Sequence, residues 1–192
     1  MANQALPVDK MPEAEVTLRL AMAIIEGGHT VNNVFVAIDG AQVKTRTKVH
    51  FPIVEFLNSL GWSSAEQNIR WQCSYQHTAY KSAIVVHSSS GEGDLVVELK
   101  SGRKLRVESK KGPLVRSKSS PEYPLIREAI GQLMTIKIAH PNDLLAVAVP
   151  HSEKFADLAN QWRNRPLMKN ADIHIITVRR DNSITGLENV GI

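Results

Sequence analysis

The sequence predicts a single α/β domain, and two parts of the chain carry this prediction. In the second half, a strand pattern at 144–149, a helix pattern at 152–165 and a strand pattern at 173–178 follow one another. A strand, a helix and a second strand in this order imply a right-handed parallel crossover. Before them, residues 91–112 have the alternation and the glycine turn of a β-hairpin. The length of 192 residues and the hydrophobic content of 43% suffice for one core.

The first 47 residues are expected to form an N-terminal helix and hairpin extension of one compact domain, whose main part spans 48–192. A helix is predicted over 12–26, because apolar residues recur at helical spacing and two glycines follow them. We interpret its apolar face as core or dimer packing. A small hairpin is predicted over 31–47, since an Asp-Gly pair between two strand patterns favours a two-residue turn.

The main part is expected to begin with a helix over 48–60, whose apolar residues fall on one side. Glu55 lies on the opposite side of this helix, so we reject it as a metal ligand. Strands are predicted at 68–75, where apolar and polar residues alternate, and at 83–87. After the central hairpin, a basic loop rich in proline and serine leads to a helix over 125–139.

The hydrophobic pattern of the central hairpin predicts its register. A three-residue loop with Gly102 in the left-handed conformation places apolar pairs on one face and charged residues on the other. In this register Asp94 lies directly opposite Glu108, and Lys110 points to the same side as Glu108. A two-residue loop would mix charged and apolar partners on both faces, so we prefer the first register. Two carboxylates and a lysine should therefore gather at the open end of the hairpin.

This group of side chains has a chemical use. Two carboxylates on facing strands form a site for a hard divalent cation such as Mg²⁺ or Mn²⁺. A cation in such a site can hold a phosphodiester oxygen and lower the pKa of a bound water. The lysine can position that water or neutralise charge on the phosphorane. An ordinary solvated hairpin with a basic face is the alternative reading of the same residues.

Asp94 is followed after thirteen residues by Glu108, Ser109 and Lys110, and this spacing resembles the PD-(D/E)xK signature of restriction-endonuclease-like nucleases. Gly93 stands where that family usually has proline. The resemblance implies an αβββαβ core with a mixed central sheet flanked by helices. The predicted order of elements matches this core, with one extra helix and strand after it.

By this resemblance, Asp94 and Glu108 bind the metal, and the Ser109 carbonyl adds a ligand. Lys110 assists the attacking water. Several families of this class carry a glutamine in the helix that follows, and Gln132 holds that place here. The aromatic residue that often comes four positions later is an isoleucine in this chain. Whether Gln132 contacts the site or only the helix surface stays open.

Basic residues concentrate on the same hairpin. From Lys100 to Lys118 they outnumber acidic residues eight to one, whereas the whole chain has a net charge of only +4. Such a footprint fits a phosphate backbone as the partner. Lys111, Arg116 and Lys118 are the candidates for DNA contacts, and a solvated loop is the alternative for the last two.

Several classes of protein are disfavoured by the sequence. A glycine-rich phosphate loop follows none of the predicted strands, which argues against nucleotide-binding Rossmann and P-loop folds. The single cysteine, Cys73, rules out an internal disulfide and a thiolate zinc cluster. The N-terminus lacks a signal-peptide pattern, and no apolar run approaches the about 20 residues that span a bilayer. We therefore expect a cytoplasmic protein without a membrane partner.

Together these observations predict a Mg²⁺-dependent deoxyribonuclease that hydrolyses the DNA backbone, with DNA as its partner. Enzymes of this kind often form homodimers to cut both strands, and a larger restriction or repair complex is the other assembly we consider. A catalytically inactive nuclease-fold module that binds DNA or a partner protein is the alternative. A structural or small-molecule-binding α/β domain is the third reading.

Overall fold

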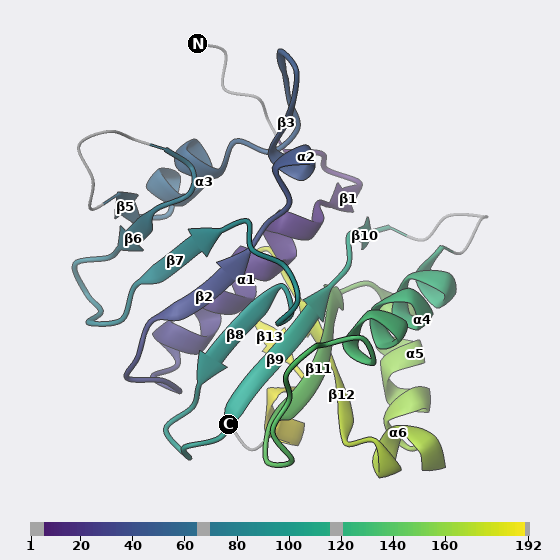
Figure 1. Cartoon of the computed structure of the whole chain (residues 1–192). Coiled ribbons are helices and arrows are strands. Elements are labelled where there is room, and N and C mark those ends of the chain that lie inside the picture. Colours follow the sequence, from purple (N-terminus) through teal and green to yellow (C-terminus); the bar gives the residue numbers. More distant parts are fainter. Residues whose placement is uncertain (1–5, 65–69, 116–120, 191–192) are drawn as a thin grey trace.

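A computed structural model describes residues 6–64, 70–115 and 121–190 of the chain (Figure 1). The described residues form a large mixed sheet of nine strands. In their order across the sheet these are β13 (Ile184–Thr185), β12 (Ile173–Val178), β11 (Leu144–Pro150), β9 (Lys104–Ser109), β8 (Leu95–Glu98), β2 (Val34–Ala37), β7 (Ile84–His87), β6 (Ser74–Gln76) and β5 (Ser63–Ser64). The α/β class that the sequence predicts is therefore confirmed.

Helices cover both faces of this sheet. One face packs against α1 (Glu13–Glu26), and the other packs against α4 (Glu122–Leu133) and α5 (Glu153–Arg163) at β9, β11 and β12. Smaller elements are β1 (Lys10–Met11), α2 (Gly40–Val43), β3 (Lys44–Thr45), β4 (Lys48–Val49), α3 (Ile53–Ser59), β10 (Gly112–Pro113), α6 (Pro166–Asn170) and η1 (Leu187–Val190). None of the helices in the described ranges has the length and apolar character needed to cross a membrane.

Strand β11 lies in the middle of these layers. Ala146 and Ala148 face α1, whereas Val147 and Val149 pack against α4 and α5. A strand covered on both faces needs apolar side chains at every position, which explains the uninterrupted apolar run at 144–149. Helix α1 is buried along most of its length, with eleven of its fourteen residues inside.

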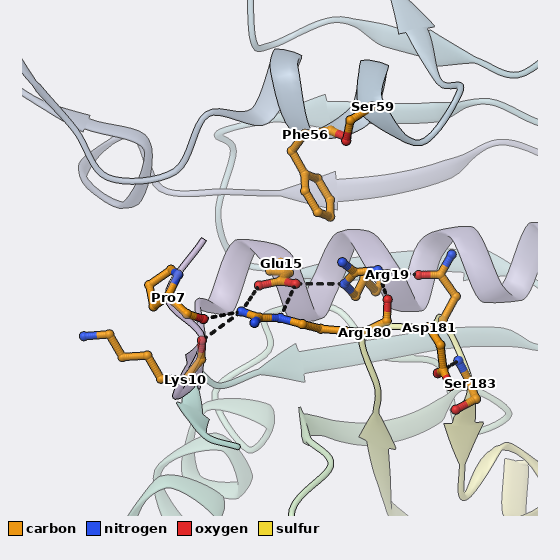
Figure 2. Close-up of polar contacts among 10 residues, drawn as sticks. Pro7, Lys10, Glu15, Arg19, Phe56, Ser59, Arg180, Asp181 and Ser183 are labelled. Atoms are coloured by element: carbon orange, nitrogen blue, oxygen red, sulfur yellow. Dashed lines mark hydrogen bonds and ion pairs between the residues drawn. The ribbon is translucent and has the colours of Figure 1, made fainter. Parts of the chain in front are cut away.

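A buried ionic cluster fixes α1 in place (Figure 2). The carboxylate of Glu15, which is fully buried, accepts hydrogen bonds from Arg19 Nε at 2.9 Å and from Arg180 Nε at 3.0 Å. Arg180 also donates to the main-chain carbonyls of Pro7 and Lys10. Arg19 donates in turn to the carbonyl of Arg180. The cluster therefore ties segments from both ends of the chain to one helix.

The prediction of a hairpin over 31–47 is wrong. Its first part is β2, which lies inside the central sheet, parallel to β7 and antiparallel to β8. Asp39 does not make a two-residue turn but caps α2, where its carboxylate accepts the N–H of Ala41 at 2.9 Å. Aspartate favours both turns and helix N-caps, so the Asp-Gly signal was ambiguous. Helix α1 and strand β2, which precede residue 48, therefore belong to the core and to the central sheet.

The helix predicted over 48–60 is shorter, because 48 and 49 belong to β4 and α3 begins after Pro52. Glu55 is exposed on α3, away from the main core, as expected. The helix predicted over 125–139 is α4, which begins earlier, at Glu122, and ends earlier, at Leu133. Of the strand predicted at 68–75, residues 68 and 69 lie outside the described ranges, and only the end belongs to β6.

The other expectations from the second half of the chain are confirmed. The strands predicted at 83–87, 144–149 and 173–178 are β7, β11 and β12, and the last two are parallel neighbours. Helix α5 begins after Ser152, whose hydroxyl accepts the N–H of Phe155 at 3.3 Å. The central hairpin has the predicted register, which the site depends on.

Replacing Glu15 by glutamine should destabilise the fold strongly. The change removes the carboxylate that pairs with both Arg19 and Arg180 in Figure 2 and leaves their two guanidinium groups without this shared counter-charge. We expect a loss of about 2 to 4 kcal/mol in the free energy of unfolding, measured by urea denaturation. Glu26→Gln, at the exposed end of the same helix, is the control and should change stability by less than about 0.5 kcal/mol. A small effect of Glu15→Gln would show that the cluster is not a stabilising contact.

Candidate active site

The open end of the central hairpin brings Asp94 and Glu108 together. Strands β8 and β9 pair Leu95 with Val107, and the N–H of Asp94 donates to the carbonyl of Val107 at 2.8 Å. Gly102 in the connecting loop has the predicted left-handed conformation, with φ 79°. The next residues outward are Asp94 and Glu108, whose carboxyl groups are in contact.

Burial and nearby negative charge raise the pKa of both carboxyl groups. Burial raises the pKa of Asp94 to about 6, although the N–H of Ser109, which donates to its Oδ2 at 2.8 Å, opposes the rise. Burial and the neighbouring charge of Asp94 raise the pKa of Glu108 to about 8. Two carboxylates this close cannot both ionise easily. In the absence of a cation, the pair therefore retains a proton near neutral pH.

Lys110 lies beside this pair and is only 5% exposed. Its Nζ is 3.3 Å from a carboxylate oxygen of Glu128 in α4 and 3.7 Å from one of Glu13 in α1. Lys110 also interacts electrostatically with both Asp94 and Glu108. Four carboxyl groups thus surround one lysine, and we refer to these five residues as the acidic cluster.

Glu13 is a member of this cluster that the sequence analysis missed. It is the first residue of α1, and its second carboxylate oxygen accepts a hydrogen bond from Gln42 Nε2 at 2.7 Å. The helix was interpreted as packing only, and the core was expected to begin at the later helix. An acidic residue in the first turn after a proline was the available signal, but such residues commonly serve the helix dipole.

A cleft of about 410 Å³ opens over the carboxylate pair. Asp94, Glu108 and Gln132 line it, together with Gln42 and the loop at 88–91. Gln132 is exposed and lines the cleft, so it lies where a contact with a bound substrate is possible. The Ser109 side chain is buried, and the main-chain N–H of Ser109 donates to the carboxylate of Asp94.

Of the three predicted DNA-contacting residues, only Lys111 belongs to the described part of the chain. Lys111 is exposed and lines a separate groove next to the cleft. Arg116 and Lys118 fall outside the described residues. The prediction for these two residues therefore stays a prediction.

The oxygen donors suit a hard divalent cation. Asp94 and Glu108 could both bind one, and the excess of carboxylates over Lys110 would favour it electrostatically. Within the described residues, no three His, Cys, Asp or Glu side chains converge as a metal site would require. A cation here would therefore rely on two carboxylates, with main-chain oxygen and water as further ligands, which is common for Mg²⁺.

The glycine at position 93 has a backbone reason. Gly93 has φ 105°, and a Cβ at this position would lie 3.0 Å from the carbonyl oxygen of Val107. Proline, the usual residue of the resembled signature, fixes φ near about −65° and cannot adopt this conformation. The departure from the signature therefore follows from how this chain enters β8.

Alanine at position 93 should destabilise the hairpin. The positive φ and the close Val107 carbonyl predict a loss of about 1 to 3 kcal/mol for Gly93→Ala. Gly131→Ala is a matched control inside α4, where a Cβ would meet open space. The control should be neutral or stabilise by up to about 1 kcal/mol. Thermal unfolding of both variants checks this, and equal effects would contradict it.

Glu108→Gln should make stability less dependent on pH. A carboxyl whose pKa is raised on folding stabilises the fold at low pH, and this contribution is lost as the pH rises toward about 8. Relative to the unmodified protein in EDTA, the variant should therefore gain about 1 to 3 kcal/mol between pH 5 and pH 9, after allowance for partial exposure. Glu98→Gln, exposed on the same hairpin, should show no such gain. If the difference in the free energy of unfolding between the variant and the unmodified protein stays constant across this pH range, the carboxylate pair does not retain a proton near neutral pH.

Comparisons with models of protein families, with curated proteins and with solved structures found no match to this chain. The function of the cleft therefore has to be inferred from its own residues.

Proposed function

We propose that this protein is a metal-dependent deoxyribonuclease with a restriction-endonuclease-like core. The observation that carries the proposal is the acidic cluster, in which Asp94 and Glu108 share a cleft and Lys110 is buried beside them. Its negative charge is unfavourable unless a proton or a cation offsets it. A divalent cation held by Asp94 and Glu108 would offset it at neutral pH.

The topology supports such a core once α1 is taken as its first helix. The order α1, β2, β8, β9, α4, β11 has the αβββαβ pattern. Strands β2, β8 and β9 are antiparallel neighbours in the sheet, and β11 lies parallel to β9. The segment between β2 and β8 then becomes an insertion that adds β7, β6 and β5 to the sheet edge.

The residues in and beside the cleft then have defined roles. Asp94, Glu108 and the Ser109 carbonyl would hold Mg²⁺ or Mn²⁺. When bound, the cation lowers the pKa of a coordinated water and neutralises charge on the phosphoryl group. Lys110 donates to the attacking water or to a phosphoryl oxygen, and Gln132 contacts the substrate from the rim of the cleft.

Two carboxylates hold the ammonium group of Lys110 near the carboxylate pair. Glu13 lies toward α1 and Glu128 toward α4, so Lys110 is bracketed from both faces of the sheet. A lysine that is fixed in this way loses little rotamer entropy when it meets a phosphate. Glu13 and Glu128 therefore act as positioning residues in this proposal.

A DNA-binding module without catalysis is the second candidate, because the cation site has only two described carboxylates. Such a module would bind DNA equally well with and without Mg²⁺ but would remain sensitive to salt. A homodimer, or a larger restriction or repair complex, is compatible with either candidate. A cytoplasmic location also stays part of the proposal.

Asp94→Asn should abolish metal-dependent cleavage. The substitution keeps the shape of the side chain and removes one metal-binding charge, so we expect cleavage to fall by on the order of 10²-fold or more. Plasmid, linear duplex and single-stranded DNA, each with Mg²⁺, Mn²⁺ or EDTA, are the assays. Asp157→Asn, exposed on α5, is the matched control and should cut normally.

The outcomes of this assay separate the candidates. Full cleavage by Asp94→Asn would remove Asp94 from the mechanism. DNA binding by the unmodified protein without cleavage of any substrate would favour the inactive module. Retained DNA binding by Asp94→Asn, with cleavage lost, would support the proposed nuclease.

A further inference from the structure

A second hollow lies next to the cleft and carries the opposite charge. This groove has a volume of about 1030 Å³ and is lined by the exposed residues Lys10, Lys48, His50 and Lys111. Asp9 and Glu13 are the acidic residues along it, and Glu13 is already engaged by Lys110 and Gln42. We call it the basic groove.

The hairpin formed by β3 and β4 forms one side of the basic groove. Figure 1 shows it projecting away from the sheet near α2 and β1. Residues 44–50, which include Lys44, Arg46 and Lys48, contain no acidic residue and are all exposed. Main-chain pairing and the bond from the N–H of His50 to the carbonyl of Val43 at 2.8 Å hold the hairpin.

The basic groove adjoins the cleft of the proposed active site. Gln42 lines both hollows, and Glu13 lines the groove while it contacts Lys110. On the other side, Lys111 follows Lys110 directly, and the chain then enters β10, which pairs with β1 beneath the groove. A polymer that lies in the cleft and passes Gln42 would therefore reach the groove.

We propose that the β3–β4 hairpin, together with Lys10 and Lys111, binds the DNA backbone next to the cleaved bond. This inference rests on the proposed nuclease function. The charge fits a polyanion, because three lysines line the groove and two further basic residues stand on the hairpin. Contacts of this kind hold phosphates and carry no sequence information, so they position the strand in the cleft.

A triple substitution in the hairpin tests this proposal. The variant Lys44→Ala, Arg46→Ala, Lys48→Ala is compared with Lys81→Ala, Arg165→Ala, Lys169→Ala. The control removes the same charge from exposed positions that do not line the groove. Binding of a short fluorescent DNA duplex is titrated over a range of salt concentrations with Mg²⁺, in the Asp94→Asn background that prevents cleavage. Thermal unfolding of each variant shows that it is folded.

The hairpin variant should bind the duplex about 10-fold more weakly or worse at low salt. The slope of log K against log salt should become shallower by about 2 to 3, since each lost phosphate contact contributes about 0.9 for duplex DNA. The control should leave both quantities unchanged. In cleavage assays with Asp94 restored, the hairpin variant should raise KM with little effect on kcat.

The results distinguish this inference from the proposed function. If the protein cuts DNA but the hairpin variant behaves like the control, the groove is not the path of the backbone and the nuclease proposal stands. If the protein neither binds nor cuts DNA, both proposals are overturned. A shallower salt slope confined to the hairpin variant supports the assignment of the groove.

Discussion

The buried carboxylate of Glu15 is the constraint on which the placement of the candidate site depends. It pairs with the buried Arg19 and the half-buried Arg180 and thereby fixes the first turns of α1 against the sheet. Glu13 lies two residues earlier in the same turn and reaches Lys110. The same residues that anchor the helix therefore set the position of a carboxylate in the acidic cluster. Stability and the geometry of the site are coupled through one helical turn.

The like charges of the acidic cluster oppose the stability of the fold. Asp94 and Glu108 are held together by a backbone register that apolar residues determine, so their repulsion cannot separate them. The raised pKa of Glu108, which burial and the charge of Asp94 cause, records this conflict. A bound cation would remove it. Such conflicts between local chemistry and stability are expected at functional sites and are rare elsewhere.

Local patterns predicted the hairpin and the second half of the chain well, because side-chain alternation and helix caps act over a few residues. Placement of β2 could not be predicted in this way, since its neighbours β7 and β8 lie far along the chain and the Asp-Gly pair suggested a turn. Glu13 was missed for the same reason. Its role depends on where a helix packs, which only the tertiary structure determines.

The direct succession of Lys110 and Lys111 has a consequence for how this chain can vary. Neighbouring side chains on an extended segment point to opposite sides, so one lysine enters the acidic cluster and the next reaches the basic groove. An inserted or deleted residue just before them would exchange the two directions. At this point a substitution would affect the cluster or the groove alone, whereas a change of length would affect both.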